Sequence, residues 1–157
     1  MNRIAASKVK STGEQPSARF GHTLTMVSKT KAVLFGGAIS ENGTIQHHSG
    51  KFVITNETYL YDFITSRWKK LQFDNCQVPS ERAAHASAAV GELQLAVYGG
   101  AASGTNGLLK DDLHILDLKK EYSLLDTDQP GVPLISPIAS AHQEPAMDTL
   151  WYTPNHF

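Results

Sequence analysis

Two segments of the chain repeat each other at a constant distance of 63 positions. Four residues near the start of the first segment recur in the second: Pro16, Ser17, Arg19 and His22 match Pro79, Ser80, Arg82 and His85. Further along, Gly36, Gly37 and Ala38 match Gly99, Gly100 and Ala101 in the same register. These identities without a gap indicate one structural unit built twice, and such a repeat constrains the fold more than any other feature of the sequence.

After the glycine doublets the distance between equivalent residues changes. Residues 56–62 align with residues 111–117, so the first unit carries eight extra residues between positions 39 and 55. The entropic cost of closing a loop rises only slowly with its length, so surface loops accept insertions of this size. We therefore expect the insertion to lie in a loop at the surface.

Each unit has the periodicity of β-strands. Leu24 and Met26 alternate with polar residues, and the apolar run 32–35 ends at a glycine doublet, as expected of a strand covered on both faces. No segment keeps an apolar 3.6-residue period for three turns. Four short strands per unit predict an all-β fold of two propeller blades, about 16–73 and 79–123, which form an incomplete propeller.

The recurring residues have physical uses in such a fold. A glycine doublet ends a buried strand where a Cβ would obstruct a turn. Aspartates cap turns, arginines bond several carbonyl oxygens, and a tryptophan supplies apolar area. The predicted structural motif consists of Arg19, His22, Gly36, Gly37, Tyr61, Asp62, Trp68, Arg82, His85, Gly99, Gly100 and Asp117.

The glycine doublet and the spacing of Asp62, Thr65 and Trp68 resemble a Kelch repeat. Segments 82–86, 98–100 and 111–118 resemble, more particularly, the N-terminal Kelch domain of serine/threonine protein phosphatases with Kelch-like repeats. The likeness covers roughly residues 16–120. It implies a protein-binding propeller, which in that family has several more repeats and is followed by a metallophosphatase domain.

The chain also departs from that family. It contains none of the strings GDxHG, GDxxDRG or GNHE, and Ser123 stands where the second unit should have its tryptophan. Five of the seven prolines follow residue 124. We therefore expect a flexible segment 1–13, two repeats within 14–123, and a proline-rich, disordered tail over 124–157.

Three other groups of residues are candidates for a metal site or a reactive group, but a purely structural role fits each of them better. Neighbours in an extended loop point to opposite sides, so His47 and His48 form a poor chelate. Cys76 lies close to an aspartate rather than to positive charge, and residues 111–112 align with a strand start. We therefore predict no catalytic, cofactor-binding or metal-binding residue.

The net charge of −1, the single cysteine and the lack of a long apolar run complete the expectation. They predict a protein of the cytoplasm, with the nucleus as a further location, that is not secreted and has no nucleic-acid or membrane partner. Two classes of function remain open. One is a non-catalytic module, a fragment of a Kelch-domain phosphatase with a regulatory or targeting role, that binds protein partners through its loops. The alternative is part of an active enzyme whose catalytic residues lie outside this chain.

Two blades are fewer than the four or so that close a propeller. Because the blade faces are uncovered, we expect self-association, poor solubility or dependence on further repeats from a parent protein.

Overall fold

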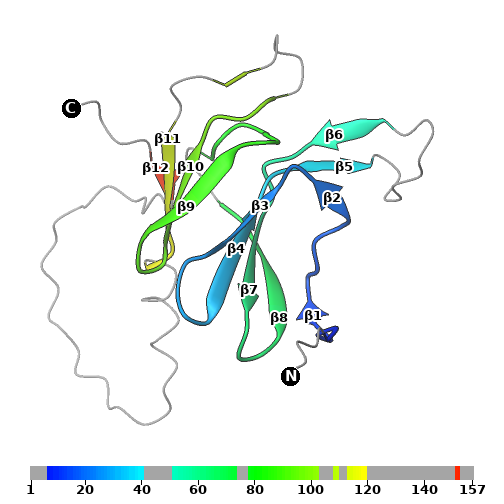
Figure 1. Cartoon of the computed structure of the whole chain (residues 1–157), viewed down its shortest axis with the longest axis vertical. Helices are drawn as coiled ribbons and strands as arrows, with labels where there is room; N and C mark the ends of the chain where they lie inside the picture. The colour runs from blue at the N-terminus through cyan, green and yellow to red at the C-terminus, as the bar shows by residue number, and fades with distance from the viewer. Residues whose placement is uncertain are drawn as a thin grey trace, which may run out of the picture.

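A computed structural model describes residues 7–40, 51–73, 78–102, 108–109, 113–119 and 151–152. Its described part is all-β, with two propeller blades and no closed ring (Figure 1). The described residues between positions 16 and 118 contain no helix, as predicted. None of the described segments is a helix that could cross a membrane.

The first blade has the strand order β1-β8-β7-β4-β3. Its strands are β3 (Thr23–Met26), β4 (Lys31–Phe35), β7 (Thr58–Asp62), β8 (Arg67–Leu71) and β1 (Thr12–Gly13). The four longer strands pair antiparallel, whereas β1 pairs parallel with β8 at the edge of the sheet. A Cβ at Gly13 would lie 2.1 Å from the Trp68 carbonyl oxygen, so glycine permits this close pairing.

The second blade has the strand order β12-β11-β10-β9. Its strands are β9 (Ala86–Gly91), β10 (Gln94–Tyr98), β11 (Leu113–Asp117) and β12 (Trp151–Tyr152). All neighbours pair antiparallel. The two blades therefore share one pairing order, with β3-β4-β7-β8 in the first matching β9-β10-β11-β12 in the second.

The fourth strand of the second blade differs from the sequence prediction. Trp151 pairs with Leu116 in the register in which Trp68 pairs with Tyr61 in the first blade. The expected tail thus supplies a strand, and with it the tryptophan that the second unit lacks at position 123. Two residues carry no recognisable period, which is why the pattern gave no signal for this strand.

A third, smaller sheet projects from the end of the first blade where the glycine doublet lies (Figure 1, upper right). This short sheet consists of β2 (Arg19–Phe20), β5 (Ala38–Ser40) and β6 (Phe52–Ile54), in the order β2-β5-β6. The predicted insertion connects β5 to β6. Residues 41–50 within it lie outside the described residues.

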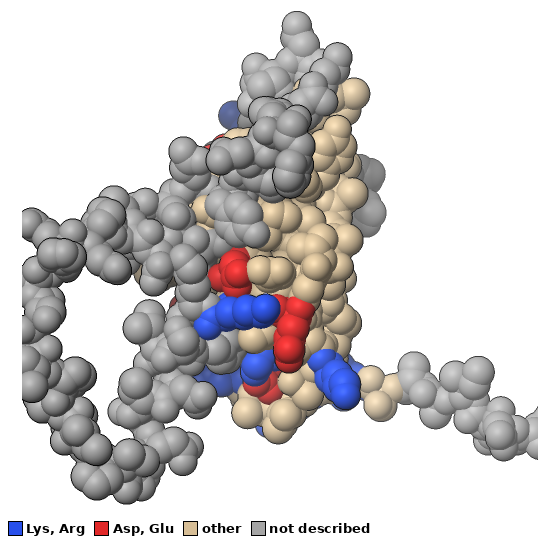
Figure 2. Space-filling view, turned by 90° about the vertical axis from the view of Figure 1, so that its left-hand side faces the viewer, with Lys and Arg blue, Asp and Glu red and all other residues tan. Residues whose placement is uncertain are grey.

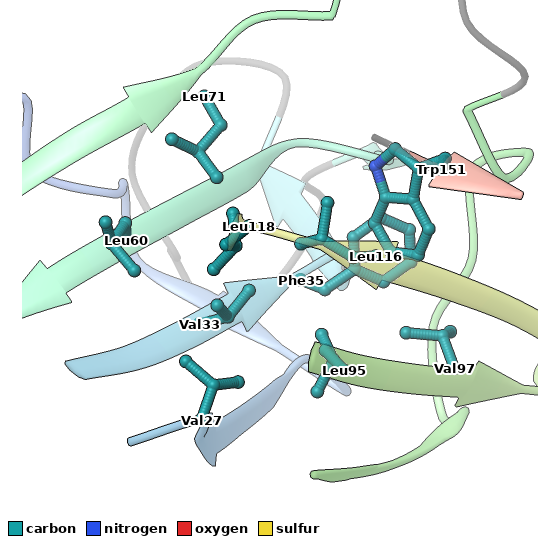
Figure 3. Packing of buried hydrophobic residues seen from close by; sticks show 10 residues of the cluster. All are labelled: Val27, Val33, Phe35, Leu60, Leu71, Leu95, Val97, Leu116, Leu118 and Trp151. Atoms are coloured by element: carbon teal, nitrogen blue, oxygen red, sulfur yellow. The ribbon is translucent and has the colours of Figure 1, made fainter. Parts of the chain in front are cut away.

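The main core fills the space between the two blades (Figure 3). Both blades contribute apolar side chains to it: Val27, Val33, Phe35, Leu60 and Leu71 from the first, and Leu95, Val97, Leu116, Leu118 and Trp151 from the second. Burial of each such side chain contributes about 1.5–3 kcal/mol relative to exposure. The blades therefore stabilise each other.

Candidate functional site

Arg82 ties the start of the second repeat to the end of β10. Its Nε donates to the Ser80 carbonyl oxygen at 3.1 Å, and its Nη1 donates to the Gly99 carbonyl oxygen at 3.1 Å. Its Nη2 donates to Ser80 Oγ at 3.2 Å. The side chain is fully buried, so it acts as an internal fastener and has no surface to offer a ligand.

Arg19 makes the same three bonds in the first repeat, to the Ser17 carbonyl oxygen, Ser17 Oγ and the Gly36 carbonyl oxygen. In addition, its Nη2 lies 2.8 Å from a carboxylate oxygen of Glu57, and its guanidinium carbon lies 5.1 Å from the centre of the Tyr59 ring. Repeated spacing in the sequence thus corresponds to repeated geometry in the structure.

Glu57 lies between two cations. Burial by itself would raise the pKa of this carboxyl, but hydrogen bonds from Lys70 and Arg19 hold the pKa below its ordinary value. A carboxylate paired in this way has no proton to give at neutral pH. The group therefore stays ionised at neutral pH and pairs with both cations.

His85 joins the two blades. Its Nε2 lies 2.8 Å from Thr23 Oγ1, and its ring packs edge-on against Phe35 with 5.3 Å between the ring centres. Burial, followed by the nearby charge of Arg82, lowers the pKa of His85 to about 4. The imidazole is consequently neutral at pH 7 and unsuited to exchange protons with a substrate there.

In each repeat the histidine lies next to the glycine doublet: His22 next to Gly37, and His85 next to Gly100. A Cβ at Gly37 would come within 2.9 Å of the His22 Cβ, and a Cβ at Gly100 would come equally close to the His85 Cβ. Burial is also the largest cause of the lowered pKa of His22. The doublet thus leaves room for the histidine of its own repeat.

The aspartates at the strand ends cap turns. Asp62 Oδ1 accepts bonds from the backbone N–H groups of Ile64 and Thr65, and Asp117 Oδ1 accepts one from Lys119. A hydrogen bond from Lys31 is the largest cause that lowers the pKa of Asp62 to about 2. These carboxylates are therefore engaged in turns.

The aromatic residues of the motif belong to the first blade. The rings of Tyr61 and Trp68 lie 4.7 Å apart on the face turned away from the second blade. With these two, the structure places every residue of the predicted motif in a strand, a strand end or a junction. It does not bring them together into one reactive site.

Charged side chains form mixed pairs. Figure 2 shows that the described Lys, Arg, Asp and Glu side chains gather mainly low on the face in view, with both signs interspersed. A pocket of about 460 Å³ contains the Lys31–Asp62 pair. Its lining is Glu14, Lys31, Leu60, Asp62, Thr65, Arg67, Trp68 and Lys69. Such a mixed lining does not select one class of ligand.

The other chemical candidates lie largely outside the described residues. Positions 47–48, 76 and 111–112 are among those the structure does not describe. Within the described ranges, no group of three His, Cys, Asp or Glu residues is arranged to hold a metal ion.

Sequence reasoning missed the exposed aromatic pair on the short sheet. Phe20 and Phe52 pack edge-to-face with 5.0 Å between ring centres, and each side chain remains about half exposed. Val53, the next residue of β6, is similarly exposed on the opposite face of the short sheet. The two phenylalanines are 32 positions apart, so only the pairing of β2 and β6 with β5 brings them together. The available signal in the sequence was Phe52, an aromatic residue that directly follows the polar part of the insertion.

Comparison with known proteins places these repeats in a family. The model described as the KLHDC2/KLHL20/DRC7 Kelch-repeats domain matches residues 1–141. Acyl-CoA-binding domain-containing protein 4 of Arabidopsis thaliana is 34% identical over 74% of this chain, and F-box/kelch-repeat protein At1g51550 of the same plant is 30% identical over 86%. Serine/threonine-protein phosphatase BSL2, also from Arabidopsis thaliana, is 33% identical over 58%.

The chain spans 15%, 26% and 10% of the lengths of these three relatives, respectively. Their names describe three different kinds of protein. The matched family model covers the glycine doublets, both repeated arginines and every strand of the two blades except β12. The chain therefore belongs to the Kelch-repeat family.

Proposed function

We propose that this chain is a non-catalytic protein-interaction module that binds a protein partner through its short sheet. The exposed Phe20–Phe52 pair is the observation that carries the proposal. Aromatic side chains that remain exposed yet held rigid by each other are the type of residue that dominates binding energy in protein interfaces.

The position of the short sheet supports this role. The sheet stands beyond the strands of the blade, and β6 forms one of its edges (Figure 1). A partner can therefore approach the aromatic pair without disturbing the core between the blades. An edge strand also offers backbone N–H and C=O groups to an extended segment of a partner.

A narrower form of the proposal is a regulatory or targeting role within a Kelch-domain phosphatase of the cytoplasm or nucleus. Similarity to BSL2 supports it, but the comparable similarity to acyl-CoA-binding domain-containing protein 4 favours a different kind of parent. The module itself is proposed to lack activity. Incubation of the full chain with a phosphopeptide and Mn²⁺ should release no phosphate above buffer, and release that a chelator abolishes would contradict this.

Site-specific photo-crosslinking tests the proposed surface. We expect p-benzoylphenylalanine at position 52 to capture a partner band in cells, and Phe20→Ser in the same chain to reduce that band at least tenfold, as loss of a central aromatic contact does. The crosslinker at Ile64, an exposed apolar residue in the β7–β8 turn, is the matched control. Equal capture from positions 52 and 64, or capture insensitive to Phe20→Ser, would overturn the proposal.

A further inference from the structure

Each blade has one face against the core and one face turned away from it. On the outer face of the first blade, Leu24, Met26 and Phe63 are exposed, Trp68 is half-buried, and Tyr59 and Tyr61 are buried beside Lys70. On the outer face of the second blade, Ala86, Ala88, Val90, Tyr98 and Leu113 are exposed, and Ile115 is buried. Both outer faces are predominantly apolar.

The two repeats superimpose residue by residue in their backbone bonding. The Phe63 N–H donates to the Thr30 carbonyl oxygen at 2.9 Å, and the Leu118 N–H donates to the Leu93 carbonyl oxygen at the same distance. Together with the common register of Trp68 and Trp151, these bonds establish which residues are equivalent. The outer face of each blade is accordingly equivalent to the face that the other blade buries.

At the junction inside the chain, Phe35 of the first blade packs on Trp151 of the second with 5.2 Å between ring centres. Phe35 is equivalent to Tyr98, and Trp151 is equivalent to Trp68. Tyr98, on the outer face of the second blade, and Trp68, on the outer face of the first, are therefore equivalent to Phe35 and Trp151. Between two copies of the chain, Tyr98 and Trp68 can form the contact that Phe35 and Trp151 form within one copy.

Exposure changes sharply between equivalent positions. Phe35 is 0% exposed and Tyr98 50%, whereas Val27 is 3% exposed and Val90 53%. On the first blade, Phe63 is 49% exposed, although its equivalent Leu118 is 0% exposed. These residues keep an apolar character suited to burial, and among the described residues no equivalent blade covers them.

We propose that a second copy of this chain covers these faces in a head-to-tail arrangement. The outer face of the second blade in one copy packs on the outer face of the first blade in the next, with Tyr98 against Trp68. The proposal is independent of the short sheet, because Phe20 and Phe52 belong to neither face.

The chemistry of the two faces fits this arrangement. Within the chain, Thr25 Oγ1 and Ser87 Oγ form a hydrogen bond across the junction. Their equivalents on the outer faces are Ala88 and Leu24. Replacement of both polar partners by apolar residues leaves no unpaired group at that point of the contact, which is close to neutral in free energy.

The geometry also favours a ring over a symmetric pair. Complementary faces at opposite ends of one molecule make a heterologous contact, which closes when the rotation per step allows it. Propellers close with roughly four to eight blades, so rings of about two to four copies are expected.

Sedimentation of the full chain and of two matched variants tests the proposal. We expect the wild type to sediment with two to four times the monomer mass of 17.1 kDa. Leu24→Lys blocks the first-blade face and Val90→Lys blocks the second-blade face, so each variant alone should be monomeric. An equimolar mixture should form one heterodimer, because each variant retains one complementary face.

Ile64→Lys, which adds the same charge outside both faces, should sediment like the wild type. Circular dichroism checks that the variants are folded, and Met26→Lys replaces Leu24→Lys if that variant unfolds. A monomeric wild type at 100 µM, single variants that associate like the wild type, or a mixture that remains monomeric would each overturn the proposal. None of these outcomes bears on crosslinking at position 52, so the two proposals fail separately.

Discussion

Gly36 and Gly99 hold equivalent places in the two repeats and share a φ of 65°. A Cβ at Gly36 would lie 2.6 Å from the Arg82 carbonyl oxygen, whereas at Gly99 the nearest atom is the Leu109 carbonyl oxygen at 3.8 Å. Left-handed strain alone costs about 1–2 kcal/mol. We expect Gly99→Ala to lose about that much stability and Gly36→Ala about 3 kcal/mol or more, because the clash adds to the strain.

Chemical unfolding of the two alanine variants measures this difference directly. Equal losses would show that the backbone angle, and not the neighbouring blade, sets the requirement for glycine.

His85 gives the stability a dependence on pH. Its pKa is about 4 in the folded chain and 6.5 ordinarily, so the unfolded state binds the proton first. The free energy of unfolding should therefore be highest above pH 6.5 and fall by about 2–3 kcal/mol as the pH drops to 4. Denaturation at pH 7.0 and 4.5 should show this loss.

His85→Gln keeps an amide for Thr23 but does not titrate, so it should flatten most of the change. His22 contributes in the same direction, since its pKa is also lowered. Asp62 acts mainly below pH 4, because its carboxyl has an ordinary pKa of 3.8 and a folded pKa of about 2, and its contribution is lost as the pH falls between these values. An unchanged pH profile in His85→Gln would contradict the assignment.

At the scale of elements, β12 completes the second blade through one side chain. Trp151 is fully buried against Phe35, and Phe73 lies with its ring centre 6.1 Å away. Trp151→Ala should lower the free energy of unfolding by about 3–5 kcal/mol, the usual cost of removing a buried aromatic ring. Thermal or urea denaturation measures this loss.

Trp68→Ala is the matched control, because Trp68 holds the equivalent register position on a partly exposed face. Its loss should be clearly smaller. If both substitutions cost the same, Trp151 does not contribute to the shared core as described.

The strands that the sequence predicted are those with a repeated motif or a clear period. β3, β4, β7 and β8 and their partners β9 to β11 follow from alternation, the glycine doublets and the 63-residue repeat. β1 and β12 have two residues each, and their pairing depends on contacts distant in sequence. The Arg19 and Arg82 fasteners could be predicted because residue type and spacing suffice, whereas the Phe20–Phe52 pair arises only when the insertion folds back.

At the scale of the whole molecule, the core lies between two blades and not within either one. A thin four-stranded sheet has two faces to cover, and among the described residues the shared core covers one face of each blade. The shared core accounts for the stability of the pair, while the two outer faces account for the association proposed above. In a closed propeller each blade packs against a neighbour on both faces, whereas the two blades described here pack against each other on one face only.

The long connection between β11 and β12 has a consequence for the order in which the molecule assembles. Four residues separate β7 from β8, but 33 residues separate β11 from β12. Closing the longer connection costs about 2 kcal/mol more in chain entropy. The first blade can therefore form early from local contacts. The second needs the distant Trp151 to complete its sheet, so the Trp151 side of the shared core stays open to water until this long connection has closed.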